Sequence, residues 1–374
     1  MGKLWKHIVV SGTPYEIGYK HGKSLKSFFT TVDRVLKYLV KSEFKISFKQ
    51  FMNDCKRLLH PAIKLPEYTF IKEELQGISD GAGVSFDWLV AWNGYLSMAT
   101  YYEKPHIRCS AFVAVGSATV DGDIVMAHST HSDYRSGRLF NIIMDVEPDR
   151  GSGFRMQTAP GLICSSTDWF LCKTGIIGCE TTITNLNYQP DFESGVPYFL
   201  RVRKAMQFAE NLDEFVTIMT TKSAGDYACT WLLADKNTGE IMMLDNGLNH
   251  HGIKRTTDGI FHASNEAGTE VLQMLETTHD EHTDPSSQTG ARWLRMDYLL
   301  NEAPLSVASA KRIMTDHYDV YNNHIGASPR TICRHKKHGG ATDLKIVTGK
   351  MAPNFYGAFG PPCKNKTRKF VDKK

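Results

Sequence analysis

The sequence predicts an α+β protein in which helices come first, mainly antiparallel strands follow, and further helices and short strands close the chain. Three observations predict this order. Apolar residues keep helical spacing through the first hundred residues, strand-like runs with turn signals dominate from residue 109 to about 265, and a helical pattern crosses residues 291–302. Since 41% of the 374 residues are hydrophobic, the chain can bury a sizeable core, and no repeat or linker demands a domain break.

The amino-terminal third is predicted to be mostly helical. After the strand-like run HIVV, Thr13 and Glu16 have the spacing of a capping box, with proline between them at the first helical position. Apolar residues then keep helical spacing to about Ser42. Further helices are expected at residues 47–59, at 66–77 and from about 85 onward.

A hairpin is predicted from Cys109 onward. The segment CSAFVAVGSATVDGDIVMAH has two β-rich runs around an Asp-Gly pair that suits a two-residue turn. A turn centred there places Cys109 opposite Asp133 and Tyr134, although a slip in the turn would shift the partners by a few residues. The returning segment HSTHSDY thus predicts a site beside the cysteine, formed by His128, His131 and Asp133.

The later strands are read from β-rich runs between turn signals. They are expected in NIIMDVEP, TGIIGCETTIT, ACTWLLADKNTGEIMMLDNG, GIFHASN, TDLKIVTGKM and FYGAFGPP. Within the third of these, a hairpin turns at residues 237–239. A helix near residues 197–210 interrupts the series.

Charge and composition argue against several classes of protein. The net charge is +4, but the last eleven residues, KNKTRKFVDKK, account for it, and the rest is near neutral. This pattern predicts no nucleic-acid partner and a solvated basic tail. The apolar run near the start is too short for a signal peptide, and no run approaches the roughly 18 residues of a membrane span. We therefore expect a cytoplasmic protein without stable membrane insertion.

The eight cysteines indicate free thiols rather than a disulfide framework. They form no CxxC pair, and the chain is long enough to fold without covalent links. All of them except Cys109 are interpreted as packing residues. Cys109 itself stands between a basic residue and an apolar strand, in the segment IRCSAFVA, where it could pack or act as a nucleophile.

Four motifs occur in an order that carries a resemblance. They are SGTPYEIGYKHG, CSAFVA before the hairpin, FHASN and TICRH. Their order and spacing resemble the acyl-coenzyme A:6-aminopenicillanate acyltransferase-like family (peptidase C45 type), which comprises N-terminal-nucleophile acyltransferases and amidases. A second series, CSAF, MAHSTHSDY, APGLICSSTDWF and GIIGCETTI, resembles the phospholipase B-like lysosomal proteins. Together the resemblances cover residues from about 8 to 360.

The resemblance implies a four-layer αββα fold and cleavage of the chain between Arg108 and Cys109. Residues 1–108 would then be a helical first segment and residues 109–374 the catalytic core, held together as one folded unit and a heterodimer of its own two fragments. A free thiol has a pKa of about 8.5 and an α-amino group one of about 7.7–8.0, so the new terminal amine can act as the base for its own thiol.

The resemblance also assigns roles to other residues. Asn265 in FHASN matches an asparagine that stabilises the oxyanion of acyl transfer. His128 agrees with the phospholipase B-like pattern and is expected to hydrogen-bond the nucleophile. The family strip has an aspartate where this chain has His131, and Asp133 is the nearest carboxylate. The resemblance further places two residues near the substrate: Glu180 at the pocket wall, and Arg334 either there or in a structural ion pair.

Two differences from the family pattern support an alternative function. The family commonly has glycine before the cysteine, where this chain has Arg108, and glycine eases the strain of self-cleavage. The second departure is His131. An unprocessed chain would lack the free amine, so a pseudoenzyme or binding protein of the same fold is the alternative.

A metal hydrolase is a further class to consider, because three pairs of histidines lie three residues apart. The pairs are 128 and 131, 279 and 282, and 335 and 338. On a strand such a pair points to opposite faces, and the segment around residue 280 has the composition of an exposed acidic loop. No metal is therefore expected. No cofactor is expected either, because the nucleophile, the base and the oxyanion donors that the resemblance implies are all groups of the protein. The expected partner is a small-molecule acyl substrate: an amide, an acyl thioester donor or a lipid.

Overall fold

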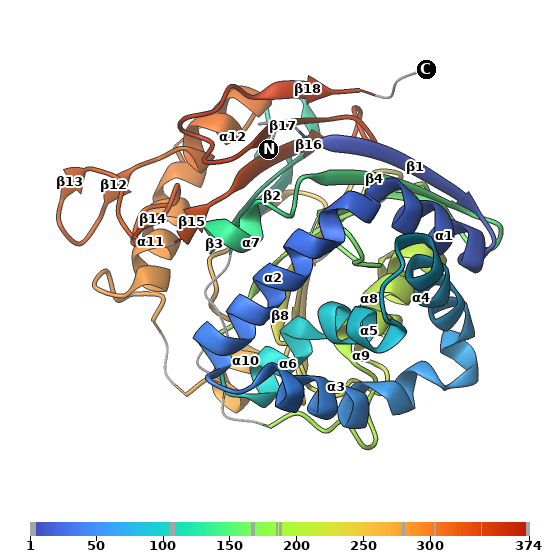
Figure 1. Cartoon of the computed structure of the whole chain (residues 1–374). Coiled ribbons are helices and arrows are strands. Elements are labelled where there is room, and N and C mark those ends of the chain that lie inside the picture. Colours follow the sequence, from blue (N-terminus) through green and yellow to red (C-terminus); the bar gives the residue numbers. More distant parts are fainter. Residues whose placement is uncertain are drawn as a thin grey trace.

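Two sheets lie face to face, and helices cover the outer surface of each (Figure 1). The computed structural model describes residues 5–104, 109–165, 169–184, 186, 189–278, 281–302, 304–337 and 339–371. Its order of layers is helices, sheet, sheet, helices. The predicted αββα fold is confirmed.

The first sheet joins strands from the amino-terminal segment and the middle of the chain. Its order is β1-β4-β5-β6-β7-β8-β9-β10, and neighbours are antiparallel except β1 and β4. The strands are β1 (Lys6–Gly12), β4 (Ile142–Pro148), β5 (Phe154–Thr158), β6 (Trp169–Cys172), β7 (Ile176–Thr182), β8 (Cys229–Asp235), β9 (Glu240–Asn246) and β10 (His251–Thr256). The predicted hairpin of β8 and β9 is confirmed.

The second sheet carries Cys109 on one of its inner strands. Its main path is β11-β2-β3-β16-β17-β18, and the short β15 links β3 to β14. The strands are β11 (Gly259–Ala263), β2 (Cys109–Gly116), β3 (Gly122–Asp133), β16 (Asp343–Thr348), β17 (Phe355–Phe359), β18 (Arg368–Phe370), β15 (Gly339–Ala341) and β14 (His335–Lys336). A separate hairpin pairs β12 (Tyr318–Asp319) with β13 (His324–Ile325).

One helical layer covers the first sheet, and a thinner one covers the second. The first layer has α1 (Pro14–Leu25), α2 (Phe29–Leu39), α3 (Phe48–Ile63), α4 (Thr69–Ala82), α5 (Phe86–Asn93), α6 (Tyr95–Tyr101), α8 (Tyr198–Phe208) and α9 (Leu212–Thr220). The second layer has α11 (Gln288–Leu300) and α12 (Val307–Met314), while α7 (Tyr134–Gly137) and α10 (Glu270–Leu275) are short connecting helices.

The start of α1 has the predicted capping box. The Thr13 side chain accepts a hydrogen bond from the Glu16 backbone, and the Glu16 carboxylate accepts one from the Thr13 backbone. The helical run does not continue unbroken to residue 42, because a 3₁₀ turn at Lys26–Phe28 separates α1 from α2. Glycines then allow α1 and α4 to approach closely. A Cβ at Gly18 would lie 1.9 Å from the carbonyl oxygen of Glu74, and one at Gly77 would lie 2.1 Å from that of Tyr15.

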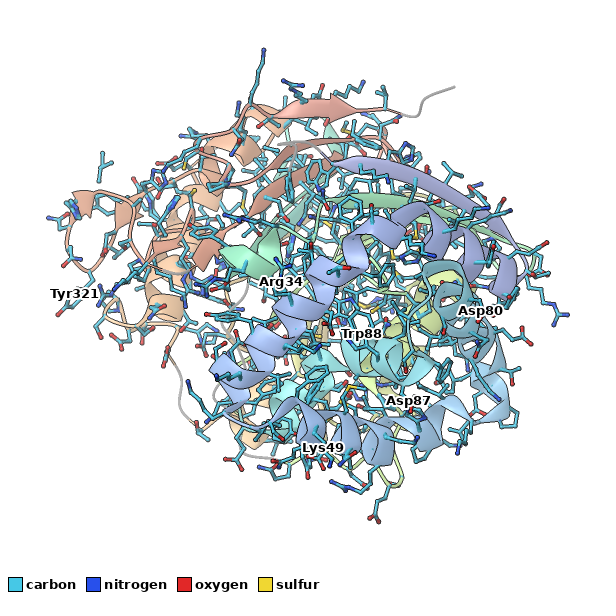
Figure 2. The ribbon with its side chains drawn as sticks, in the orientation of Figure 1. Arg34, Lys49, Asp80, Asp87, Trp88 and Tyr321 are labelled. Atoms are coloured by element: carbon cyan, nitrogen blue, oxygen red, sulfur yellow. The ribbon has the colours of Figure 1, made fainter. Side chains whose placement is uncertain are left out.

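The helical layer is polar outside and apolar inside, as an amphipathic pattern predicts. Arg34, Lys49 and Asp80 lie on its outer side, whereas Trp88 is buried (Figure 2). The Trp88 indole donates to Asp33 Oδ1 at 3.1 Å, which links α5 to α2. In the described part of the chain, no helix combines the length and apolar character that a membrane crossing needs.

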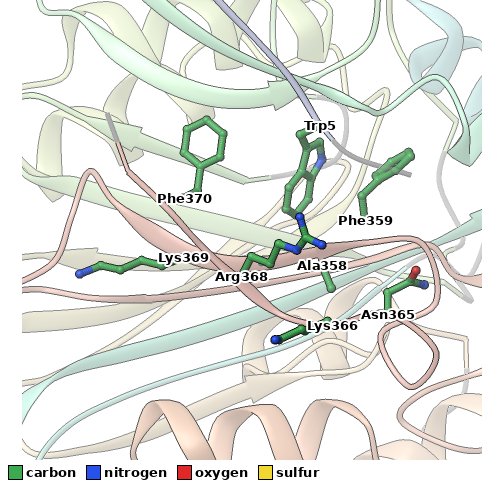
Figure 3. A pocket seen from close by; sticks show the side chains of 9 residues that line it. Trp5, Ala358, Phe359, Asn365, Lys366, Arg368, Lys369 and Phe370 are labelled. Carbon is green, nitrogen blue, oxygen red and sulfur yellow. The ribbon is translucent and has the colours of Figure 1, made fainter. Parts of the chain in front are cut away.

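Part of the basic tail differs from the predicted solvated end. β18 pairs with β17, and the Phe370 ring stacks on Phe355 with centroids 4.9 Å apart. Trp5, Arg368 and Lys369 help to line a pocket of about 450 Å³ beside this strand (Figure 3). Packing of Phe370 against Phe355 therefore fixes residues 368–370 as the edge strand of the second sheet, while Arg368 and Lys369 stay exposed.

Candidate active site

The layer between the two sheets changes character from one end to the other. At one end, which we call the apolar end, the facing side chains are Val113, Val115, Ile124, Met126, Ile177, Ala234, Ile241 and Val347. Along the same faces of the same strands, the other end has Cys109, His128, Thr130, Thr181, Thr230, Asp245, Asp343 and Lys345, all of them buried. We call this second set the polar end.

Cys109 is the first residue of β2 and lies at the polar end. Its partner across the hairpin is Thr130, so the predicted pairing with Asp133 or Tyr134 is wrong. The connection is longer than the predicted two-residue turn, and the register shifts between Ala114 and Gly116. The Asp258 carboxylate holds this wider loop, because its Oδ1 accepts hydrogen bonds from Ser117 N at 2.6 Å and Ser117 Oγ at 2.7 Å.

Asp133 does not join the cysteine. It lies opposite Gly339 at the far end of β3, and its carboxylate accepts a hydrogen bond from Arg135 N at 2.7 Å, which caps α7. His131 is buried, but on β3 it points to the face opposite that of His128, as its spacing predicts. His131 therefore faces the layer of α11 rather than the space between the sheets.

Arg292 of α11 binds the start of β2 and the end of β11 together. Its Nη1 donates to the Cys109 carbonyl oxygen at 2.8 Å and to Ser110 Oγ at 2.9 Å. Its Nη2 donates to the Ser264 carbonyl oxygen at 3.0 Å and to Asn265 Oδ1 at 2.7 Å. One planar guanidinium thus fixes the backbone of the cysteine relative to the predicted oxyanion donor.

Burial and neighbouring charges lower the pKa values of the groups around this contact. The pKa of Arg292 is lowered to about 9, first by burial and next by the like charge of Arg334, while a negative charge on Cys109 opposes the shift. Burial and the charges of both arginines also lower the pKa of His131 well below its usual value, which keeps its imidazole neutral.

Asn265 is held in the strained geometry that a functional role often requires. Its φ is +80°, in the left-handed region that non-glycine residues rarely adopt, and it is fully buried. Its Nδ2 donates to the Thr182 carbonyl oxygen at 2.8 Å, which ties it to the opposite sheet. An amide nitrogen carries two N–H groups, so this bond orients the second one.

His128 also crosses between the sheets. Its Nε2 lies 3.0 Å from the Glu180 carbonyl oxygen, and burial lowers its pKa well below the usual value, with a further contribution from the Lys345 charge. On β3 it lies opposite Ala111, two residues along β2 from Cys109. Its Nδ1 is buried and has no hydrogen-bond partner among the described residues.

Glu180 turns its side chain away from the cysteine. Its neighbour Cys179 faces the space between the sheets, whereas Glu180 lies on the helical face, where its Oε1 accepts a hydrogen bond from Tyr227 at 2.9 Å. The backbone carbonyl of Glu180 takes part in the polar end through its contact with His128. A role in substrate binding stays a prediction.

Arg334 lies beside Arg292 rather than between the sheets. It is buried, its Nη2 donates to Gln288 Oε1 of α11 at 2.5 Å, and burial lowers its pKa to about 10. These contacts agree with both predicted roles of Arg334, which are a place near the substrate pocket and a structural ion pair. Arg108, the other half of the predicted cleavage site, lies outside the described residues.

A buried ion pair completes the polar end. Lys345 Nζ lies 2.7 Å from Asp343 Oδ1 and 2.9 Å from Oγ1 of Thr130, the residue that pairs with Cys109 across the hairpin. The same carboxylate accepts from Thr130 N at 2.9 Å and, through Oδ2, from Gln157 Nε2 at 2.9 Å. These bonds satisfy both charges and join the two sheets.

A match to a known sequence family shows the family to which the chain belongs. The sequence profile of the phospholipase B family matches residues 71–276, which is more than half of the chain. The chain belongs to the phospholipase B family. The matched range includes Cys109 and ends after Asn265, and it confirms the phospholipase B-like resemblance.

Other matches are weaker. An uncharacterized protein of Archaeoglobus fulgidus is 27% identical over 251 residues, which are 60% of this chain and 40% of that protein. This phospholipase B family member therefore spans well under half the length of its archaeal relative.

Two solved structures are similar at low identity. Penicillin V acylase from Agrobacterium tumefaciens has a TM-score of 0.40 and 10% identity, covering 70% of this chain and 86% of its own. A single-residue variant of conjugated bile acid hydrolase from Clostridium perfringens has a TM-score of 0.30 and 8% identity, covering 72% of this chain and 90% of its own.

In this family member, Arg292 contacts the candidate site but was not among the residues predicted from the sequence. A signal exists in the helix that carries it, since Arg292 shares a face with Met296 and Leu299, both of which are buried. An arginine in the middle of an apolar helical face requires buried acceptors, and the cysteine carbonyl is one of them.

Proposed function

We propose that this phospholipase B family member is a hydrolase whose nucleophile is the Cys109 thiol, exposed as a chain end by cleavage after Arg108. One observation carries the proposal. Cys109 begins β2 at the polar end, where Arg292 connects its backbone to Asn265. A cysteine that only packed would be expected among the aliphatic side chains at the apolar end.

Cleavage of the precursor would use the same thiol. The Cys109 sulfur attacks the Arg108 carbonyl carbon, the C–N bond breaks as the nitrogen takes up a proton, and a thioester joins the two fragments. Water then hydrolyses this thioester. The products are a carboxylate on Arg108 and a free α-amine on Cys109, which has a pKa of about 7.7–8.0 in an unperturbed chain.

Acyl transfer would follow the same course with a substrate. The α-amine accepts the thiol proton, sulfur bonds to the substrate carbonyl carbon, and the leaving amine or alcohol takes the proton as its bond to carbon breaks. Water hydrolyses the resulting thioester and restores the thiol. The second N–H of Asn265 is suited to donate to the oxyanion that forms in both halves.

Substrate class is inferred from the family and from burial. Membership of the phospholipase B family favours a lipid acyl ester or amide, with water as the acceptor. Cys109, His128 and Asn265 are fully buried in the described structure. A substrate would reach them only after the chain opens at this end, and a cut before Cys109 creates a chain end there.

A second candidate is a binding protein that is not processed. Full burial of Cys109 favours it, and so does His131, which replaces the carboxylate of the related acyltransferases. Such a protein would keep the polar end as a structural network. It would form no acyl-enzyme.

Acyl-enzyme trapping distinguishes the two candidates. The full-length protein is incubated with a lysophospholipid and with an N-acyl amino acid, quenched in acid, and the peptide containing Cys109 is weighed by mass spectrometry. The hydrolase predicts an acyl adduct on Cys109 and release of fatty acid, both absent in Cys109→Ala and retained in Cys179→Ala, a matched buried cysteine. No adduct and no acid release with either substrate would favour the binding protein.

A further inference from the structure

Two histidines and two cysteines meet outside the candidate active site. The four side chains are His317, Cys333, His335 and Cys363, and their nitrogen or sulfur atoms all lie within 4.8 Å of one another. They come from three separate segments: the connection between α12 and β12, the segment that leads into β14, and the loop between β17 and β18.

The separations fit one metal ion. His335 Nε2 lies 3.5 Å from Cys333 Sγ and 3.4 Å from Cys363 Sγ. Zinc binds nitrogen at about 2.0–2.1 Å and thiolate at about 2.3 Å in a tetrahedron, which sets its ligand atoms about 3.3–3.8 Å apart. Both of these separations fall within this interval, and the ligand atoms of the whole cluster lie within 4.8 Å of one another.

The fourth ligand also points to a metal. His317 Nε2 is buried and has no hydrogen-bond partner among the described residues. Its ring lies beside that of His335, with centroids 5.4 Å apart. A buried imidazole nitrogen without a partner is costly, and coordination would satisfy it.

We propose that His317, Cys333, His335 and Cys363 bind one Zn²⁺ ion as a closed structural site. Two imidazoles and two thiolates are the donors that select zinc over magnesium or calcium, and four protein ligands leave no position for substrate. Binding converts both thiols to thiolates and releases two protons, so the ion and its ligands sum to zero charge.

The ion would stabilise a region that has little regular structure of its own. β14 has two residues, and β12 and β13 have two each. Arg334 lies between two of the ligands, and its contact with Gln288 joins this segment to α11. The zinc site would therefore hold Arg334 in place whether or not Cys109 is a nucleophile.

Metal binding can be measured on the full-length protein. The protein is incubated with equimolar Zn²⁺, desalted and assayed by mass spectrometry for metal, and a parallel sample receives Co²⁺. The proposal predicts about one zinc per chain, and for cobalt the thiolate charge-transfer and visible bands of a tetrahedral site. A protein that retains no zinc and gives no such bands would overturn the proposal.

Cys363→Ser is the sharpest variant because Cys363 is exposed and its loss leaves the core intact. Its zinc affinity should fall by more than the roughly 10–100-fold that loss of a supporting hydrogen bond costs. His324→Ala removes an exposed histidine of β13 and should bind zinc like the wild type. Zinc binding by Cys363→Ser at wild-type affinity would exclude the site.

The thiols offer one further control. If Cys333 and Cys363 formed a disulfide instead, alkylated protein without reductant would be lighter by two hydrogens and would carry no alkyl group on either residue. That outcome would also overturn the zinc proposal. The zinc proposal and the proposed function can fail independently, because the acyl-enzyme assay reports only on Cys109.

Discussion

The apolar and polar ends of the layer between the sheets are built from the same strands, yet they contribute differently to the protein. At the apolar end, aliphatic side chains such as Met126 and Ile177 exclude water and stabilise the fold. At the polar end, Cys109, Lys345 and Asp343 are equally buried, and their polar groups gain little net free energy. A chain that buries so many polar groups at one end keeps them there for chemistry or for specificity.

The comparison also shows how the polar groups are satisfied. His128 reaches the Glu180 carbonyl, Asn265 reaches the Thr182 carbonyl, and Gln157 reaches Asp343, so each bond crosses from one sheet to the other. The polar end therefore holds the sheets together by directional bonds, whereas the apolar end does so by packing. Substitutions at the two ends should separate stability from function.

The largest effect is expected for Arg292→Met. It removes the hydrogen bonds that Arg292 donates to the buried carbonyls of Cys109 and Ser264 and to the Asn265 amide oxygen, and each loss costs about 1–3 kcal/mol. We expect chemical unfolding to show a loss of about 3–9 kcal/mol together with loss of fatty-acid release. Arg312→Met, which removes an exposed arginine of α12, should change the unfolding free energy by less than about 1 kcal/mol.

If Arg292→Met unfolded with the same free energy as the wild type, the connecting role of this side chain would be wrong. Loss of activity at unchanged stability would leave a role in charge stabilisation alone.

A change at the apolar end should affect stability only. Trp169 belongs to the same buried apolar cluster as Met126 and Ile177, and its ring contacts Phe355 with centroids 4.5 Å apart. Trp169→Ala should lower the unfolding free energy by about 3–5 kcal/mol because it leaves a cavity. In the cold, where the variant is still folded, its rate of fatty-acid release per folded molecule should equal that of the wild type. A large loss of this rate would mean that the two ends are not separable.

The smallest effect is a pH dependence that arises at the polar end. Burial holds the pKa of His128 well below that of a free histidine, so the unfolded chain takes up a proton that the folded chain refuses. The stability is complete above about pH 6.5 and is lost as the pH falls, by about 2 kcal/mol at pH 5. His128→Gln should reduce the difference in unfolding free energy between pH 7 and pH 5 by that amount.

His324→Gln, which changes an exposed histidine, should leave the difference between the two pH values unaltered. If His128→Gln kept the same difference in unfolding free energy between pH 7 and pH 5 as the wild type, the low pKa assigned to His128 would be wrong.

The helices and strands were predicted from the sequence more accurately than the contacts between distant residues. Local signals placed the capping box at Thr13 and the strand that begins at Cys109, since both depend on neighbouring residues. The hairpin register was wrong because the Asp258 carboxylate, far along the chain, holds the loop wider than an Asp-Gly turn allows. Asp133 was placed in the site as a consequence of that register, and its side chain caps α7 instead.

Contacts between distant segments were the least accessible from the sequence. Arg292 lies 183 residues from Cys109, and nothing in its local pattern names its acceptors. The predicted absence of metal relied on histidine pairs three apart, whereas the cluster of His317, Cys333, His335 and Cys363 draws on three segments. Folding of the chain brings these three segments together.

The central claim is that Cys109 is an amino-terminal nucleophile, and the intact mass of the purified protein under denaturing conditions tests it most directly. Wild type and Cys179→Ala should each give two fragments, residues 1–108 and 109–374, while Cys109→Ala stays whole. A single full-length mass for the wild type after long incubation would contradict the claim and leave the polar end as a buried structural network.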